Sequence, residues 1–331
     1  MSAPTVLVTG DPTLLTQAAA LRSAVFTEEQ GVDPALEVDG RDADAVHVVA
    51  VEDAPGAGGP PAVLSTARLL EFGERAVVGR VAVRSGLRGR GIGAAVMREL
   101  EREAVERGLL VVELHAQVDV VGFYRRLGYQ AVGEHYVQAG IEHVTMTREL
   151  VPGLRPVRDA DAEALQHLIG TTWSEYPGCV LDVDAEEPWL RAPARAYDAV
   201  GKRFWVVEEG LGDAGDPADR GDPADRGAAR SVVACVGLRP DGGTEGGFEL
   251  KSLYVAAVAR RRGLGRALTR LVERQARADG RLHGRLWTDS RFHDAHQLYE
   301  RLGWEWTGAQ RELHDLSNTT EYEMVRELRQ R

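Results

Sequence analysis

Two short stretches of the sequence combine arginine and glycine in the same order. Arg88-Gly89-Arg90-Gly91-Ile92-Gly93 lies in the first half and Arg260-Arg261-Arg262-Gly263-Leu264-Gly265 in the second, and both fit the pattern R-x-x-G-x-G. Each stretch follows a strand-like run and opens an amphipathic, helix-like pattern, so it presents backbone N–H groups without helical partners. Glycine keeps side chains away from that backbone, and arginine adds positive charge. We expect each stretch to bind an anion such as a diphosphate.

A tyrosine stands at nearly the same distance after each arginine-glycine stretch. Tyr124 lies in GFYRRLGYQAVGEH, and Tyr299 lies in HQLYERLGWEWTGAQ. A phenol can act as a general acid where negative charge develops. The alternative is that each ring only packs at the start of a helix. The matched position in both halves favours the chemical role.

Other familiar site patterns fit the sequence poorly. Neither half contains the G-x-G-x-x-G of a dinucleotide fold with its acidic partner, or the G-K-[ST] of a nucleotide-binding P-loop. His293 and His296 are three residues apart, but no acidic partner has the spacing of a metal site. The two cysteines, Cys179 and Cys235, are far apart and are predicted to be reduced packing residues. We therefore expect no bound metal.

The chain is predicted to be an internal duplication. The segment 78–108 is echoed by 250–280, and each is followed by its tyrosine segment in the same order. The proline- and glycine-containing segment 151–156 marks the join, so we place domains at 1–150 and 151–331. Within the second half, 215–227 repeats the residues GDPADR, which are too polar to be buried, and is predicted to form a loop.

The periodicity of apolar residues predicts similar elements in the two halves. In the first half we expect helices over 14–25, 91–107 and 119–127, and strands over 47–52, 63–72, 75–83, 110–115, 130–137 and 143–150. In the second half we expect helices over 160–174, 185–200, 264–279 and 294–301, strands over 204–209, 232–240, 248–255 and 284–288, and two closing strands. This order indicates the α/β class, with a mixed sheet in each half covered by helices.

Composition and charge exclude several classes of protein. The 331-residue chain is 44% hydrophobic and 27% charged, as in soluble globular proteins. A formal net charge of −11 argues against nucleic-acid binding, which needs a basic face. No apolar run is long enough to span a membrane and no secretory signal is visible, so we expect a cytoplasmic protein. The acidic balance would favour a cationic small substrate.

The motifs together resemble the GNAT superfamily of N-acetyltransferases. The resemblance rests on the R-x-x-G-x-G loops, on the apolar strands that precede them, and on the F/L-Y-x-x-L-G-aromatic segments, each present twice. The first half also resembles ElaA proteins, through LRxxVFxxEQGV at 21–32, Glu37-x-Asp39, Ala45-Val46-His47 and Gly140-Ile141-x-His143-x-x-Met146. The second half lacks these segments and is similar to small-molecule members of the superfamily. The resemblance implies two tandem GNAT folds, each with a mixed, mostly antiparallel sheet flanked by helices.

The resemblance also implies acetyl-CoA as the cofactor and direct attack of an amine on its thioester. It places the cofactor along the strands at Val81, Val83, Leu253 and Val255, with its diphosphate on the loops 88–93 and 260–265. Gln117 matches a family amide that binds the pantetheine arm, a place taken by Phe292 in the second half. Tyr124 and Tyr299 would protonate the departing thiolate.

The general base differs between the halves. Glu249 matches a family carboxylate that acts as base directly or through water, whereas Val77 takes its place in the first half. There His47, Glu29 or a water chain remain as candidates. The expected function is transfer of an acyl group to the primary amine of a small molecule, by a monomer of two pseudo-symmetric domains or a homodimer. Two alternatives remain: one domain serves as a degenerate CoA-binding scaffold, or the chain is a non-catalytic acyl-CoA sensor.

Overall fold

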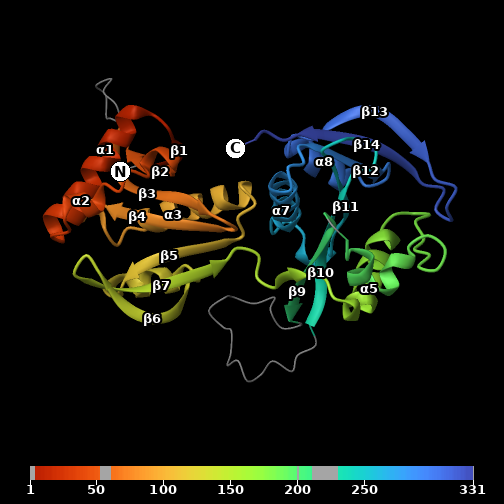
Figure 1. The fold of residues 1–331 in the computed structure, drawn as a ribbon, viewed down its shortest axis with the longest axis horizontal. Coiled ribbons are helices and arrows are strands. Elements are labelled where there is room, and N and C mark those ends of the chain that lie inside the picture. The colour runs from red at the N-terminus through yellow and green to blue at the C-terminus, as the bar shows by residue number, and fades with distance from the viewer. Residues whose placement is uncertain (1–3, 53–60, 200, 211–229, 331) are drawn as a thin grey trace. The chain divides into compact units, whose positions relative to one another are not determined.

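The computed structural model describes residues 4–52, 61–199, 201–210 and 230–330. The chain divides into two compact units, Met1–Leu150 and Val151–Arg331 (Figure 1). The repeat predicted to form a loop at 215–227 lies outside the described residues.

The first unit contains a seven-stranded sheet. Its strands are β1 (Thr5–Thr9), β2 (Val46–Glu52), β3 (Ala62–Phe72), β4 (Arg75–Val83), β5 (Val111–Gln117), β6 (Gln130–Gln138) and β7 (Ile141–Glu149). Its helical segments are α1 (Pro12–Arg22), the π-helix η1 (Ser23–Glu29), α2 (Pro34–Glu37), η2 (Asp42–Asp44), η3 (Ser85–Leu87), α3 (Ile92–Glu106), η4 (Val118–Val120) and α4 (Val121–Arg126). The edge strand β1 was not predicted.

The second unit contains another seven-stranded sheet. Its strands are β8 (Leu154–Pro156), β9 (Arg203–Gly210), β10 (Arg230–Pro240), β11 (Gly247–Val255), β12 (His283–Asp289), β13 (Glu305–Glu312) and β14 (Thr320–Glu327). Its helical segments include η5 (Asp159–Asp161), α5 (Ala162–Ser174), η6 (Pro188–Arg191), α6 (Pro193–Ala196), η9 (Ala257–Ala259), α7 (Leu264–Ala278) and α8 (His293–Arg301).

The two sheets have the same topology. The strand orders are β1-β2-β3-β4-β5-β7-β6 and β13-β14-β12-β11-β10-β9-β8, which coincide when the second is read in reverse. In each sheet one neighbouring pair is parallel, β4 with β5 and β11 with β12, and the other pairs are antiparallel. The α/β class and the mixed, mostly antiparallel sheets are thus confirmed.

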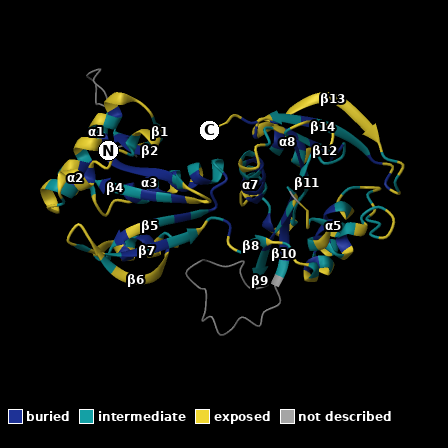
Figure 2. Ribbon diagram, viewed as in Figure 1, coloured by how far each residue is buried: buried dark blue, intermediate teal, exposed yellow. Residues whose placement is uncertain are grey.

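Helices cover both faces of each sheet. In β2, Val48 and Ala50 belong to the core cluster with α3, whereas the alternate residues Val49 and Val51 pack with α1. Alternate residues of a strand point to opposite faces, so β2 lies between two layers of helix. Figure 2 shows the buried residues concentrated on the central strands. In the second unit α5 packs against Phe204 and Val206 of β9, and α7 packs against β10 and β11.

The parallel pair in each sheet separates before its strands end. Strand β4 pairs with β5 only over Arg75–Val78, and β11 pairs with β12 only over Gly247–Glu249. Both strands carry a bulge after that point, where Arg80 (φ 56°) and Ser252 (φ 51°) adopt left-handed backbone conformations. The backbone groups of the last residues of β4 and β11 therefore have no partner on β5 or β12.

One predicted helix is wrong. The segment predicted as a helix over 185–200 forms only the short segments η6 and α6, in the part up to residue 199 that the structure describes. Pro188 and Pro193 stand at the first helical positions of these segments. A proline lacks the N–H needed inside a helix and clashes with the preceding turn, so the longer helix cannot form.

Candidate active site

Both R-x-x-G-x-G loops lead from a strand into an uncapped helix. Gly91 (φ 80°) precedes α3 and Gly263 (φ 84°) precedes α7, and neither helix start has a side-chain cap. A Cβ added at either glycine would meet no atom within 4 Å, so the space above the helix start is open. The first N–H groups of α3 and α7 are therefore available to an anion, in keeping with the expected role of the loops.

The last glycine of each loop allows close packing, because an added side chain would crowd its neighbours. A Cβ on Gly93 would lie 3.2 Å from Cγ2 of Val83, and one on Gly265 would lie 2.8 Å from Cδ2 of Leu298. These glycines allow the helix to pack closely against its neighbours.

The first arginine of each loop is engaged within its own domain. Arg88 Nε donates to the carbonyl of Val83 at 3.2 Å, and Arg260 Nε donates to that of Val255 at 3.0 Å. Their guanidinium groups also form ion pairs, Arg88 with Glu29 at 2.6 Å and Arg260 with Glu175 at 2.6 Å.

The remaining loop arginines differ in their partners. Arg262 pairs with Glu209 at 2.6 Å, which removes it from the set of unpaired cations. Arg90 and Arg261 have no side-chain partner among the described residues. These two are the cations that the loops leave free.

Each tyrosine hydroxyl lacks a hydrogen bond within the described part of its domain. Tyr124 lies in α4 and packs edge-on against Phe123 and Tyr129. Tyr299 lies in α8 and packs near Trp304. Burial raises the pKa of both phenols, so each keeps its proton in the resting protein. A protonated hydroxyl without a partner can donate to a ligand.

A cavity of about 770 Å³ opens in the second domain. Tyr299 lines it, together with Leu253 and Tyr254 from the end of β11. Its walls also carry aromatic and charged side chains: Trp173, Trp189, Tyr197, Trp287, Phe292, Glu186, Glu187, Lys202, Arg239, Lys251, Asp289, Glu312, Asp315 and Glu321. The cavity thus joins the predicted acid to the strand predicted to hold the cofactor.

Glu249 lies behind this cavity rather than in its wall. It is 4% exposed, and its Oε2 accepts a hydrogen bond from Arg239 Nε at 2.8 Å. Lys251 Nζ lies 3.6 Å from its Oε1, which has no hydrogen bond within the described chain. Arg239 and Lys251 do line the cavity. Glu249 therefore contacts two cationic side chains, Arg239 and Lys251, that line the cavity.

The two predicted amide-position residues precede the helical segments that carry the tyrosines. Gln117 stands directly before η4, and Phe292 directly before α8. The Gln117 amide exchanges hydrogen bonds with Gln30, at 2.9 and 3.3 Å. Phe292 packs against Tyr176 at a centroid distance of 4.7 Å and lines the cavity.

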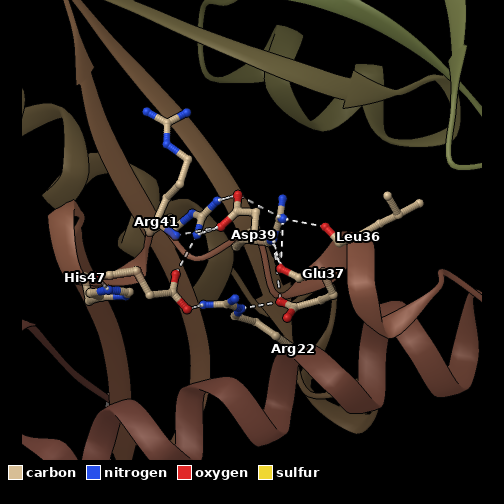
Figure 3. A network of polar contacts seen from close by, with 9 residues as sticks. Arg22, Leu36, Glu37, Asp39, Arg41 and His47 are labelled. Atoms are coloured by element: carbon tan, nitrogen blue, oxygen red, sulfur yellow. Dashed lines mark hydrogen bonds and ion pairs between the residues drawn. The ribbon is translucent and has the colours of Figure 1, made fainter.

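Residues of the ElaA-like motif come together in a charged network in the first domain (Figure 3). Arg22 pairs with Glu37 at 2.5 Å and with Asp42 at 2.8 Å, and Arg68 pairs with Asp39 and Asp42. The Arg68 guanidinium holds the pKa of Asp39 well below its usual range. His47 contacts the carbonyl of Asp42 through Nε2 at 2.8 Å.

Two candidate bases of the first domain already have partners. His47 is buried and its Nε2 is used within the network, and Glu29 is paired with Arg88. Glu175, the equivalent partner of Arg260, could have been found by asking which acidic residue follows the first long helix in each half. Arg68, by contrast, carries no motif signal and was missed.

His293 and His296, whose spacing resembles that of metal ligands, have other contacts. His296 Nε2 lies 2.9 Å from the carbonyl of Asp289, and its ring packs edge-on against Trp306. In the described ranges, no three His, Cys, Asp or Glu side chains are grouped as metal ligands. No helix among the described residues has both the length and the apolar character needed to cross a bilayer.

Comparisons with known proteins agree with the fold and motifs. The acetyltransferase (GNAT) domain model matches residues 62–150, and the acetyltransferase (GNAT) family model matches residues 171–304. The first half is similar to Escherichia coli ElaA, with 33% identity over 137 residues, or 40% of this chain and 84% of ElaA. Bacillus subtilis YjcF, named an N-acetyltransferase, is 29% identical over 41% of this chain and 92% of its own length.

Solved structures were compared as well. An acyl-CoA N-acyltransferase from Pseudomonas aeruginosa is 33% identical, with a TM-score of 0.39, and the match covers 44% of this chain and 99% of that one. The crystal structure of Escherichia coli ElaA is 27% identical, with a TM-score of 0.39 and the same coverage. From the family models and the identity to ElaA, we conclude that the chain belongs to the GNAT acetyltransferase family, whose members use acetyl-CoA, and that it carries two such domains.

Proposed function

We propose that this chain is an N-acetyltransferase that transfers an acetyl group from acetyl-CoA to the primary amine of a small molecule. The observation that carries the proposal is the cavity of the second domain, in which Tyr299 faces the same space as the free end of β11. Bound acetyl-CoA supplies a thioester whose acyl carbon an amine can attack. The chain must bind this cofactor, orient the amine and move two protons.

The residues proposed to hold the cofactor fit its chemistry. The loops 88–93 and 260–265 offer uncapped helix N–H groups for a diphosphate. Val81 and Val83 of β4, with Leu253 and Val255 of β11, lie where the parallel partner has separated. Their backbone groups can bind the amide groups of a pantetheine arm, as a strand would. Arg90 and Arg261 add free positive charge.

Tyr124 and Tyr299 are proposed as the general acids. Each hydroxyl is protonated and has no competing hydrogen bond in its described domain. A phenol in this state can give its proton to sulfur as negative charge develops there. Because the raised pKa keeps both phenols protonated, neither can accept the amine proton, which separates their role from that of the base.

Glu249 is proposed as the base of the second domain, acting through water. Its Oε1 lacks a hydrogen bond and lies behind a wall that includes Lys251. One ordered water in the cavity could connect this oxygen to an amine without moving the strand. The cations Arg239 and Lys251 hold the carboxylate in place.

The walls of the cavity favour a cationic acceptor. Glu187 lines it and receives a hydrogen bond from Trp189 Nε1. Burial raises the pKa of the Glu187 carboxyl, and a cation bound next to it would stabilise its charged form. Aromatic side chains around it can contact the same cation through their ring faces.

The test is turnover of the full chain. Free CoA thiol is measured with acetyl-CoA and a broad panel of primary amines, including amino acids, polyamines and aminoglycosides. We expect release that depends on the amine, and a loss of about 10²-fold or more in kcat when Tyr124→Phe and Tyr299→Phe are combined. A panel without any amine-dependent release, or a double variant with unchanged kcat, would contradict the proposal.

A division of labour between the domains is a second candidate. It is favoured by Val77, which replaces the glutamate in the first domain, and by Phe292, which replaces the amide in the second. In this case one domain would bind CoA only weakly and shape the site of the other. Calorimetric titration of the full chain with CoA decides between them, because two sites of similar affinity would rule out a degenerate domain.

A further inference from the structure

A row of polar side chains crosses three strands of the first domain. Gln117 of β5 lies directly opposite His143 of β7, and His143 lies directly opposite Tyr136 of β6. Residues directly opposite each other in antiparallel pairs place their side chains on the same face of the sheet. These three residues therefore form one row. One end of the row is Gln117, the amide that matches the pantetheine-binding position of the family.

The His143 ring is held in one tautomer. Its Nδ1 lies 2.8 Å from the carbonyl oxygen of Ile141. A carbonyl can only accept a hydrogen bond, so Nδ1 must carry the proton and Nε2 must carry the lone pair. Nε2 has no partner among the described residues. The sheet therefore presents a half-buried imidazole whose basic nitrogen is unused.

Neighbouring side chains fix the plane of this ring. Tyr136 stacks on His143 with an interplanar angle of 20° and a centroid distance of 6.0 Å. The Tyr136 hydroxyl lies 2.5 Å from Nδ1 of His115, and Thr145 Oγ1 lies 3.4 Å from the same atom. His115 is thus a positioning residue for Tyr136, and Tyr136 for His143.

The second domain shows what this position does. Strand β5 ends at Gln117 and β12 ends at Asp289, so the strand ends match Gln117 with Asp289 rather than with Phe292, which lies after the strand, directly before α8. The residues opposite Gln117 and Asp289 are His143 and Glu321. Asp289 and Glu321 both line the 770 Å³ cavity. By equivalence within the shared topology, His143 occupies the position of a cavity-wall residue.

We propose that His143 is the general base of the first domain. This inference rests on the proposed function and supplies the group that Val77 leaves missing. Its Nε2 takes a proton from the acceptor nitrogen as that nitrogen bonds to the acyl carbon. Tyr124 gives its phenolic proton to the sulfur as the carbon–sulfur bond breaks, with the electron pair remaining on sulfur. The imidazolium then returns its proton to the phenolate through solvent, so that protons and electrons balance.

The kinetic test uses the full chain with its second domain silenced by Glu249→Gln and Tyr299→Phe. In this background we compare His143→Ala and His143→Asn with His135→Ala. An asparagine side chain can still donate to the Ile141 carbonyl, but it has no basic nitrogen. His135 is an exposed histidine on the same hairpin, paired with Glu142, and serves as the matched control. Adding Tyr124→Phe to the background defines the residual rate.

We expect His143→Ala and His143→Asn to lower kcat by about 10²-fold or more, with little change in the KM for acetyl-CoA, while His135→Ala remains active. The loss should be largest for butylamine, smaller for methoxyethylamine and smallest for trifluoroethylamine. The N–H of a less basic amine becomes more acidic as the nitrogen bonds to the acyl carbon, so this amine needs less help from a base. Recovery of activity in His143→Asn, or an equal loss for all three amines, would show a structural role and overturn the proposal.

A second readout needs no turnover. Nuclear magnetic resonance of the ¹⁵N-histidine-labelled full chain identifies the ring signals of His143 by their absence in His143→Asn. We expect the Nδ1-protonated tautomer, and a shift of these signals on addition of CoA that the His135 signals do not share. The Nε2-protonated tautomer overturns the proposal.

The kinetic outcomes separate the two levels of inference. A silenced background that releases no CoA with any amine removes the first domain from the proposed function, and His143 with it. An active background in which His143→Asn turns over normally leaves the proposed function intact and overturns only the role of His143.

Discussion

The first arginine of each R-x-x-G-x-G loop makes contacts within the protein. Arg88 and Arg260 both donate to the carbonyl of the last strand residue and pair with an acidic residue that follows the first long helix. This contact ties the N-terminal helical layer to the loop. The two loops thus share a set of contacts that hold them in shape before an anion binds. Arg90 and Arg261 are the loop arginines that have no side-chain partner among the described residues.

Replacement of Glu249 should separate chemistry from cofactor binding in the second domain. With the first domain silenced by Tyr124→Phe and His143→Asn, we expect Glu249→Gln to lower the remaining kcat about 10²-fold, because the oxygen that accepts a proton is lost, while CoA affinity is unchanged. Steady-state kinetics with the best amine, together with calorimetry, measure the two effects. Glu305→Gln, an exposed carboxylate on β13, is the control. Unchanged kcat in Glu249→Gln would remove this residue from the mechanism.

Replacement of Glu37 should destabilise the first domain without a direct effect on chemistry. Glu37 is 6% exposed and its partner Arg22 is 3% exposed, so Glu37→Gln leaves a buried charge with one partner fewer. We expect a loss of about 3 kcal/mol in the free energy of unfolding. Glu99→Gln, which removes an exposed helical pair with Arg102, should cost less than about 1 kcal/mol. Urea unfolding of both variants checks the difference, and equal costs would argue against a structural role for the network.

At the scale of elements, the start of each central helix is shaped by a glycine in a left-handed conformation. Gly91 and Gly263 turn the chain from the loop into α3 and α7, where the space above the turn is empty. A side chain there would strain the backbone and enter the space proposed for the diphosphate. The helix start and the anion site are therefore one feature.

Gly263→Ala should weaken binding of CoA by the second domain. A methyl group at φ 84° costs about 1 kcal/mol and approaches the anion site, so we expect the Kd for CoA to rise about tenfold or more. Gly242→Ala is the control, because a Cβ added at Gly242 would meet no atom within 4 Å and its backbone is not left-handed. Calorimetry on the full chain measures both variants. An unchanged Kd at the second site would place the diphosphate elsewhere.

At the scale of the whole molecule, the chain carries two units with separate cores. All six tryptophans lie in the second half of the sequence. Tryptophan fluorescence therefore reports the unfolding of the second unit, whereas circular dichroism reports both. This difference allows the stability of the first unit to be followed in the intact chain.

Acid should destabilise the first unit through its ion-pair network. Arginine contacts hold the pKa values of Asp39 and Asp42 below the ordinary 3.8, so these groups stabilise the fold at neutral pH. That contribution is lost as the pH falls through 3.8 and below, where the unfolded chain takes up protons first. Burial raises the pKa of Glu101, which opposes the trend, whereas the pKa of Glu99 is lowered by its hydrogen bonds with Arg102 and adds to it.

We expect Asp39→Asn to reduce the acid dependence of the circular dichroism transition and to leave the tryptophan transition unchanged. Urea unfolding between neutral pH and about pH 3, followed by both probes, measures this. The matched Asp44→Asn, at an exposed residue of η2 outside the ion-pair network, should alter neither transition. A wild-type chain whose first unit keeps its stability down to pH 3 would contradict the expectation.

Local pattern by itself determined the family, the two sheets and the loops. The R-x-x-G-x-G stretches, the alternating strands and the tyrosine segments each encode their structure within about a dozen residues. Such short-range signals survive in the sequence because helix starts and strand alternation depend on neighbouring residues. The failure at 185–200 has the same cause, since the apolar pattern was given more weight than the prolines that prevent the helix.

Only the tertiary structure decided which side chains share a site. The Arg88–Glu29 pair, the network around Arg68, the cavity beside Tyr299 and the row that contains His143 all join residues far apart in the chain. Their proximity follows from strand order and register, and a shift of one residue in register would turn His143 to the opposite face. The sequence therefore predicted the loops and the candidate acids, and the pairing of β5, β7 and β6 placed a candidate base in the first domain.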